Sequence, residues 1–140
     1  MSYDTDNIFA KILRGELPCH KVFEDDETFV FLDIMPRADG HCLVIPKTPC
    51  RNMLDASEAQ MTAVMRTTQK IAKALMTAFD APGVTLQQFN EAAGGQEVFH
   101  LHVHVLPRHE GDRLRPPGQM ADHEVLAAQA AKIGAVLAAM

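Results

Sequence analysis

Three histidines alternate with branched apolar residues over five positions, and this pattern constrains the fold more than any other stretch of the chain. Residues 100–104 read His-Leu-His-Val-His, and the run ends at Pro107. Branched residues closed by a proline predict a β-strand, in which successive side chains point to opposite faces. The three imidazoles are therefore expected on one face, with Leu101, Val103 and Val105 on the other. The apolar face suits burial against a helix or a second layer, which leaves the histidine face free to line a cleft.

Length and composition predict a single globular domain. The chain has 140 residues, of which 47% are hydrophobic and 22% charged, enough to bury a core without disulfides or metal. No apolar run is long enough to cross a bilayer, and residues 1–6 are acidic, without the basic and then apolar pattern of a secretion signal. We therefore expect a cytoplasmic protein. The cysteines, Cys19, Cys42 and Cys50, are odd in number and contain no Cys-x-x-Cys pair, which argues against a disulfide framework and a thiolate zinc site.

The charge excludes two classes of partner. A net charge of −5 and a pI near 5.7 argue against binding to nucleic acids or anionic membranes, because both depend on a basic surface. A small phosphate ligand is still compatible with this charge, because it needs only a few local donors.

Hydrophobic periodicity predicts five strands and one long helix. The helix spans residues 57–79, begins with a capping-box pair, Ser57 and Gln60, and carries an apolar stripe. Methionines 61, 65 and 76 in that stripe are expected to be pliable core filler. Shorter helices are predicted at 7–14 and 121–139, strands at 21–24, 28–34, 41–47, 84–90 and the histidine segment, and a linker at 109–118.

Other candidate residues lie near strand ends. Asp33 follows an aromatic-rich strand, where a carboxylate is either exposed or paired with a specific partner. His41 begins the next strand, and a lone histidine there is ordinarily structural. Gly94 and Gly95 precede the histidine segment, and glycines allow backbone N–H groups to approach an anion, although most such pairs are simply turns.

The clustered histidines suit two kinds of chemistry. A neutral imidazole can attack phosphorus at neutral pH, while protonated neighbours stabilise the phosphate charge. Several imidazoles that converge on a cation are also a common zinc arrangement. The triad by itself does not decide between a nucleophile and a metal site.

The surrounding pattern resembles the histidine triad (HIT) family of nucleotidyl hydrolases and transferases. The likeness is concentrated in residues 90–108 and continues upstream in residues 6–12, 24–26, 31–34 and 41–47 in the family's order and spacing. It covers residues 6–108 and is closest to bacterial-type members near the adenosine phosphoramidase branch.

This resemblance implies a role for each matching residue. His102 matches the nucleophile that attacks the α-phosphate of an adenosine-type nucleotide and becomes a transient nucleotidyl-histidine, from which water releases the nucleoside monophosphate. His100 and His104 match the flanking histidines, and His41 matches a fourth histidine of the site. The implied substrate-binding residues are Asn90 and Gln96 at the phosphates with the Gly95 and Val98 backbone nearby, Asp33 at the ribose, and Ile8, Phe9, Ile12, Phe31 and Ile34 around the base.

The resemblance also implies an architecture and a set of partners. The expected fold is α+β, with a five-stranded antiparallel sheet, a short N-terminal helix, one long core helix and a C-terminal helix. Residues 6–108 would form the HIT domain, and residues 109–140 a linker and a helix packed on the same domain. A homodimer whose two sheets form one layer is expected, with a purine nucleotide as substrate and neither metal nor cofactor. Some bacterial relatives hold a structural zinc with cysteines near the first helix, but residues 4–9 contain none.

One departure leaves alternatives open. Glu97 stands where the phosphoramidase branch typically has a serine that contacts the leaving group, and a carboxylate beside phosphate is repulsive unless it is protonated or turned away, for example towards solvent. The leading hypothesis is a metal-independent hydrolase of phosphoramidates or dinucleoside polyphosphates. The alternatives are a histidine-rich metal site and a nucleotide-binding scaffold dimer with weak turnover.

Overall fold

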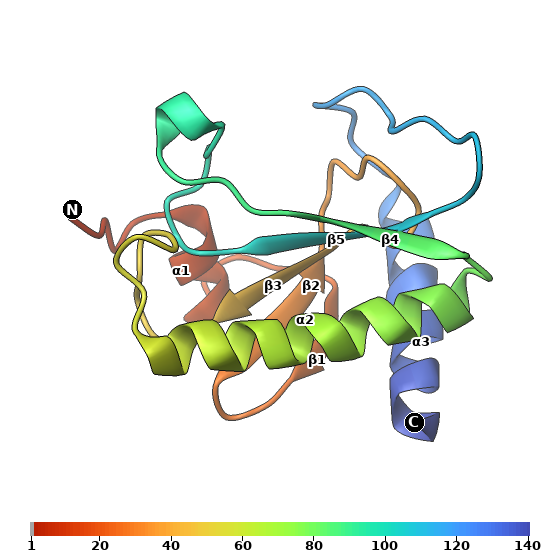
Figure 1. Cartoon of the computed structure of the whole chain (residues 1–140), viewed down its shortest axis with the longest axis horizontal. Coiled ribbons are helices and arrows are strands. Elements are labelled where there is room, and N and C mark those ends of the chain that lie inside the picture. The colour runs from red at the N-terminus through yellow and green to blue at the C-terminus, as the bar shows by residue number, and fades with distance from the viewer. Residues whose placement is uncertain (1) are drawn as a thin grey trace.

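The computed structural model describes residues 2–140 and contains one five-stranded sheet with helices on both faces (Figure 1). Every neighbouring pair of strands is antiparallel, in the order β1-β2-β3-β5-β4. The elements are α1 (Ile8–Leu13), β1 (Lys21–Glu24), β2 (Thr28–Leu32), β3 (Cys42–Pro46), α2 (Glu58–Ala78), β4 (Gly83–Gln87), the 3-10 turn η1 (Ala92–Gly94), β5 (Val103–Arg108) and α3 (His123–Ala139). The predicted α+β fold is confirmed.

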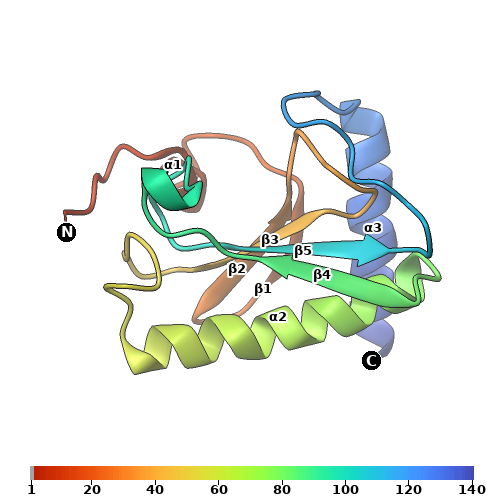
Figure 2. The same ribbon diagram turned by 45° about the horizontal axis from the view of Figure 1, so that its top comes forward.

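The two faces of the sheet carry separate apolar clusters, because side chains alternate along each strand. Val30, Val44 and Val105 point towards α2 and pack with Ile71 and Leu75 of that helix. On the opposite face a smaller cluster joins the sheet to α1 and consists of Phe9, Phe29, Phe31, Leu43 and Ile45. Figure 2 shows α2 running along one face of the sheet, with α1 on the side away from it.

The long helix begins as predicted, but its exposed side is more apolar than expected. Gln60 N–H donates to Ser57 Oγ at 3.0 Å and Ser57 N–H donates to Gln60 Oε1 at 2.9 Å, so both halves of the capping box form. Met65 is 47% exposed and Met76 is 39% exposed. Their prediction as core residues is wrong, because the helix buries a different face, which carries Val64, Ile71 and Leu75.

Four predicted strands are longer than the observed ones, and β3 is shorter by one residue at each end. β2 ends at Leu32 because the next residue starts a turn, in which Met35 N–H donates to Asp33 Oδ1 at 2.9 Å. β4 ends at Gln87 instead of residue 90. β5 begins only at Val103, because Leu101 N–H leaves the sheet and donates to Cys50 O at 2.9 Å.

The C-terminal helix α3 packs against α2 and β1 and buries Leu126 and Ile133. No helix formed by residues 2–140 is both long and apolar enough to cross a membrane.

Candidate active site

The side chains of His102 and His104 share one face, and Leu101, Val103 and Val105 lie in the cluster against α2, as the alternation predicts. The ring centroids of His102 and His104 are 5.0 Å apart. Alternation persists through residues 101 and 102 although the strand proper starts at Val103. The chain therefore presents the second and third histidines of the triad together.

His102 is held in one tautomer by its own neighbour in the chain. Its Nδ1 lies 2.7 Å from the carbonyl oxygen of His100. A carbonyl can only accept, so Nδ1 carries the proton and the lone pair of Nε2 is free. Burial lowers the pKa of His102, which keeps the ring neutral at neutral pH. A buried neutral imidazole with a free Nε2 has the electronic state of a nucleophile.

His41 and His104 form a directed hydrogen-bonded pair. The backbone N–H of Arg37 donates to His41 Nδ1 at 3.1 Å, so the proton of a neutral His41 ring resides on Nε2. His41 Nε2 lies 2.9 Å from His104 Nδ1 and donates to it, which places the His104 proton on its own Nε2. Burial is the main cause that lowers the pKa of His41 to about 4 and that of His104 to about 3. His104 can therefore offer an N–H to a ligand oxygen while remaining uncharged.

His100 has no nitrogen free for a ligand. Its Nε2 donates to Pro46 O at 2.8 Å, and its Nδ1 accepts the hydroxyl of Tyr3 at 2.6 Å. The side chain is fully buried, and burial lowers its pKa to about 4. The structure thus makes His100 a support whose carbonyl orients His102.

Asp33 lies beside this group with one oxygen uncommitted. Its Oδ1 accepts Met35 N–H, whereas Oδ2 is 3.7 Å from His41 Nε2, beyond hydrogen-bonding distance. Burial raises the pKa of Asp33, the hydrogen bond from Met35 lowers it, and the negative charge of Glu97 raises it further. Glu97 itself is exposed, in keeping with a loop residue that faces solvent.

The predicted apolar residues divide into two groups. Phe9 and Phe31 are in edge-to-face contact at 5.2 Å, Ile12 packs on the same cluster, and Phe9 also contacts the His102 ring at 4.9 Å. Val98, expected to contribute only its backbone, packs its side chain there as well. The other two are exposed: Ile8 by 54% and Ile34 by 39%.

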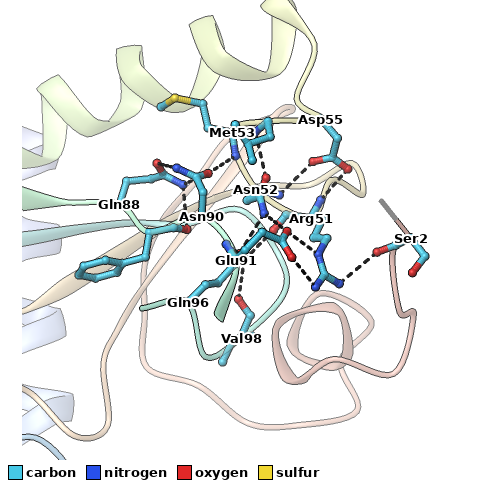
Figure 3. Close-up of polar contacts among 12 residues, drawn as sticks. Ser2, Arg51, Asn52, Met53, Asp55, Gln88, Asn90, Glu91, Gln96 and Val98 are labelled. Atoms are coloured by element: carbon cyan, nitrogen blue, oxygen red, sulfur yellow. Dashed lines mark hydrogen bonds and ion pairs between the residues drawn. The ribbon is translucent and has the colours of Figure 1, made fainter. Parts of the chain in front are cut away.

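The loop 88–98 uses its polar side chains to hold itself together (Figure 3). Gln96 is buried, and its amide donates to Arg51 O at 2.8 Å and Val98 O at 3.0 Å. Its Oε1 accepts from Asn52 Nδ2 at 3.0 Å and from Glu91 N–H at 2.8 Å. All four hydrogen-bonding positions of the Gln96 side chain are thus filled by protein groups.

Asn90 and Gly95 are engaged in the same loop. Asn90 Oδ1 accepts from Met53 N–H and Gln88 Nε2, both at 2.9 Å, and one Asn90 amide hydrogen goes to Gln88 Oε1. Gly95 has φ +100°, donates its N–H to Ala92 O at 3.0 Å, and would place a Cβ 3.2 Å from Phe89. Phe89 in turn contacts the His104 ring at 5.7 Å. The absence of a side chain at Gly95 allows Phe89 to pack closely against it, and the Gly95 N–H is used within the turn.

A cation would bind here only by breaking this arrangement. Ligand atoms of Asp33, His41 and His104 lie within 4.8 Å of one another. His41 Nδ1 already accepts the Arg37 N–H, so Nε2 is protonated and has no lone pair for a metal. The hydrogen-bonded state of these rings suits proton placement better than coordination.

Two residues at this site escaped the sequence analysis. Tyr3 reaches His100 across 97 positions of the chain, and no periodicity or motif signals that contact. Arg37 lies in the turn before His41, and its position within that turn was the only available signal.

Comparisons with known proteins identify the family and the fold. A family profile described as HIT domain matches residues 14–111. The crystal structure of the Hit-like protein involved in cell-cycle regulation from Bartonella henselae has a TM-score of 0.93 and 50% identity, over 97% of this chain and 99% of that one.

Two proteins are similar to this chain in sequence. An uncharacterized HIT-like protein of Borreliella burgdorferi is 41% identical over 109 residues, which are 76% of this chain and 78% of that protein. Adenylylsulfatase HINT3 of Arabidopsis thaliana is 35% identical over 120 residues, which are 86% of this chain and 61% of that protein. The match therefore spans about three fifths of the plant protein.

Proposed function

The chain belongs to the HIT domain family, and from the state of its histidines we propose that it is a metal-independent nucleotide hydrolase. It would cleave a nucleoside monophosphate, with AMP as the expected product, from phosphoramidates or dinucleoside polyphosphates. The observation that carries this proposal is the free Nε2 of the neutral, buried His102 ring. The name of the Arabidopsis relative, an adenylylsulfatase, supports the same class of reaction.

The first step is attack by His102 Nε2 on the α-phosphorus. A P–N bond to the ring forms, the bond from phosphorus to the leaving group breaks, and the leaving group takes the electron pair. An amine leaving group also takes up one proton from solvent, which balances the proton released when water attacks in the second step. The ring becomes positively charged, and the Nδ1–H bond to His100 O at 2.7 Å strengthens as that charge develops. Water then attacks phosphorus, releases the monophosphate with loss of a proton, and returns His102 to its neutral form.

Several groups support substrate placement in this proposal. The protonated Nε2 of His104 would donate to a phosphate oxygen, and Asp33 Oδ2 would accept a ribose hydroxyl. The N–H groups of Glu97 and Val98 have no backbone acceptor among residues 2–140 and would serve the phosphate. Phe9, Ile12 and Phe31, with the exposed Ile8 and Ile34 at the edge, would contact the purine.

Turnover of an adenosine phosphoramidate and a diadenosine polyphosphate, each with and without EDTA, tests the proposal. We expect EDTA-resistant release of AMP by the wild type and none by His102→Ala. An adenylylated protein should be trapped by acid quenching only when His102 is present. His20→Ala, at a half-buried histidine that pairs with His123 instead of the site histidines, is the matched control and should retain full activity. Activity lost to EDTA would favour a metal site, and nucleotide binding without turnover would favour the scaffold hypothesis.

We also propose that two chains pair through β4. This strand lies at one edge of the sheet, Leu86 on it is 47% exposed, and Met65 and Met76 expose apolar surface on the neighbouring α2. An open edge beside exposed apolar residues is a template for strand pairing, and antiparallel pairing about a twofold axis would continue the sheet. Light scattering should give a dimer for the wild type and for Met120→Lys, and a monomer for Leu86→Lys. A monomeric wild type at micromolar concentration would refute the pairing.

A further inference from the structure

Arg37 carries a positive charge at the histidine site that no carboxylate neutralises. Its backbone N–H lies 3.1 Å from His41 Nδ1, and its side chain is partly buried. Among residues 2–140, the ion pairs do not include Arg37, whereas the nearby Arg115 is paired with Asp39 at 2.6 Å. A partly buried guanidinium without a counter-ion is available to an anionic ligand.

The side chain of Arg37 is oriented by the segment that follows β5. Arg37 Nε donates to Arg115 O at 2.8 Å, and Arg115 N–H donates back to Arg37 O at 2.8 Å. Ala121 N–H donates to Ile34 O at 2.9 Å, and Gln129 Oε1 accepts Gly40 N–H at 3.2 Å. Figures 1 and 2 show this linker beside the loop between β2 and β3. We call these hydrogen bonds between residues 34–40 and the C-terminal segment the brace. The family match ends at residue 111, so the C-terminal half of the brace lies beyond it.

The charge of Arg37 acts on the catalytic rings. It contributes to the lowered pKa of both rings, after burial for His41, and after burial, His102 and His41 for His104. At neutral pH the four histidines are themselves uncharged, since burial lowers the pKa of each. The net charge of the chain is −5. A polyanionic substrate therefore meets a fixed positive charge, that of Arg37, in the turn that contacts His41.

We propose that Arg37 is a specificity-determining residue that binds an anionic leaving group, so that preferred substrates carry a phosphate or sulfate on the α-phosphate instead of an amine. This inference rests on the proposed nucleotidyl transfer to His102. When the bond from phosphorus to the leaving oxygen breaks, the electron pair and the negative charge move to that oxygen. The guanidinium, which keeps its proton, stabilises the charge through N–H donors. An amine leaving group gains nothing from this contact.

The test compares Arg37→Gln with wild type on three substrates, namely diadenosine tetraphosphate, adenosine 5′-phosphosulfate and adenosine 5′-phosphoramidate. Glutamine can still donate to Arg115 O, which preserves the brace. We expect kcat/KM to fall on the order of 100-fold for the anionic leaving groups and less than about threefold for the phosphoramidate. A loss confined to the tetraphosphate identifies a phosphate as the group bound, and a loss confined to the phosphosulfate identifies a sulfate. Equal losses on all three substrates would overturn the inference.

Two controls separate this contact from general effects. Arg113→Gln removes the same charge from an exposed position of the linker and should leave all three values unchanged. Arg37→Lys should recover part of the loss on anionic leaving groups, because the charge returns without the planar fork. If Arg113→Gln lowered kcat/KM for the anionic leaving groups as much as Arg37→Gln does, long-range attraction would explain the effect. That result would overturn the proposal of a direct contact with Arg37.

Calorimetric binding of ATP and AMP provides a readout that does not need turnover. Wild type should bind ATP more tightly than AMP, and Arg37→Gln should remove that difference. A wild type that hydrolyses none of the three substrates but shows this difference would refute the hydrolase and support the anion contact. Hydrolysis by a wild type that binds ATP and AMP equally well would support the hydrolase and refute the anion contact.

Discussion

Two loops border the histidines, and they use their polar groups in opposite ways. The loop 88–98 saturates its side chains internally, so that Gln96 makes four hydrogen bonds to protein groups. The loop 33–41 is held from outside by backbone contacts to the C-terminal segment. It leaves Asp33 Oδ2 without a hydrogen-bond partner, and the Arg37 guanidinium bonds only a carbonyl oxygen and no carboxylate among residues 2–140. Saturated groups hold a site together, and unsaturated groups are free to bind a ligand. Gln96 and Asp33, which the family resemblance treats alike as substrate-binding residues, are thereby distinguished.

The largest expected effect that tests this contrast is on stability. Gln96→Ala removes two N–H donors and one oxygen that accepts two hydrogen bonds from a buried network. We expect the free energy of unfolding to fall by about 3 kcal/mol. Urea unfolding measures it, with Gln69→Ala on the exposed side of α2 as the control that should change little. If Gln96→Ala retained its stability but lost affinity for AMP, Gln96 would contact substrate directly and the distinction between the loops would be incorrect.

A second effect concerns the histidine that follows the saturated loop. Folding lowers the pKa of His100 from 6.5 to about 4, so its stabilising contribution is complete above pH 6.5 and is lost as the pH falls towards 4. Between pH 7 and pH 5 we expect the ring to account for a loss of about 2 kcal/mol in the free energy of unfolding. The measurement compares the pH slope of urea unfolding in wild type and His100→Asn. Identical slopes would show that His100 does not titrate with unfolding.

The smallest expected effect belongs to the open loop. Asp33→Asn removes the charge of the oxygen that lacks a partner, and we expect KM for nucleotide to rise about tenfold, equivalent to about 1.4 kcal/mol, while stability stays nearly constant. Steady-state kinetics and urea unfolding on the same preparation give both numbers. Loss of stability with an unchanged KM would show that Asp33 supports the fold instead of binding substrate. Asp33 and Gln96 would then have the same role.

Much of the fold was predictable because its signals are local. The alternation around His102, the aromatic strand that ends near Asp33 and the capping box at Ser57 each involve residues within a few positions, and each produced the predicted element. The errors occurred where distant parts of the chain decide. Periodicity predicts Met65 in the core, because it identifies an apolar stripe without revealing whether another element covers that stripe. Strand ends were misplaced because turns at Asp33 and at Leu101 divert the backbone to other partners.

By itself, the sequence determined the sheet, the long helix and the side-by-side placement of His102 and His104, because alternation and helical period follow from backbone geometry over a few residues. The tertiary structure decided the chemical state of the site. Tyr3 and Pro46, far away in the chain, occupy both nitrogens of His100, and the Arg37 side chain is held by a carbonyl 78 positions further on. Local periodicity contains no information on such contacts, because a hydrogen bond between distant segments depends on how packed elements bring them together.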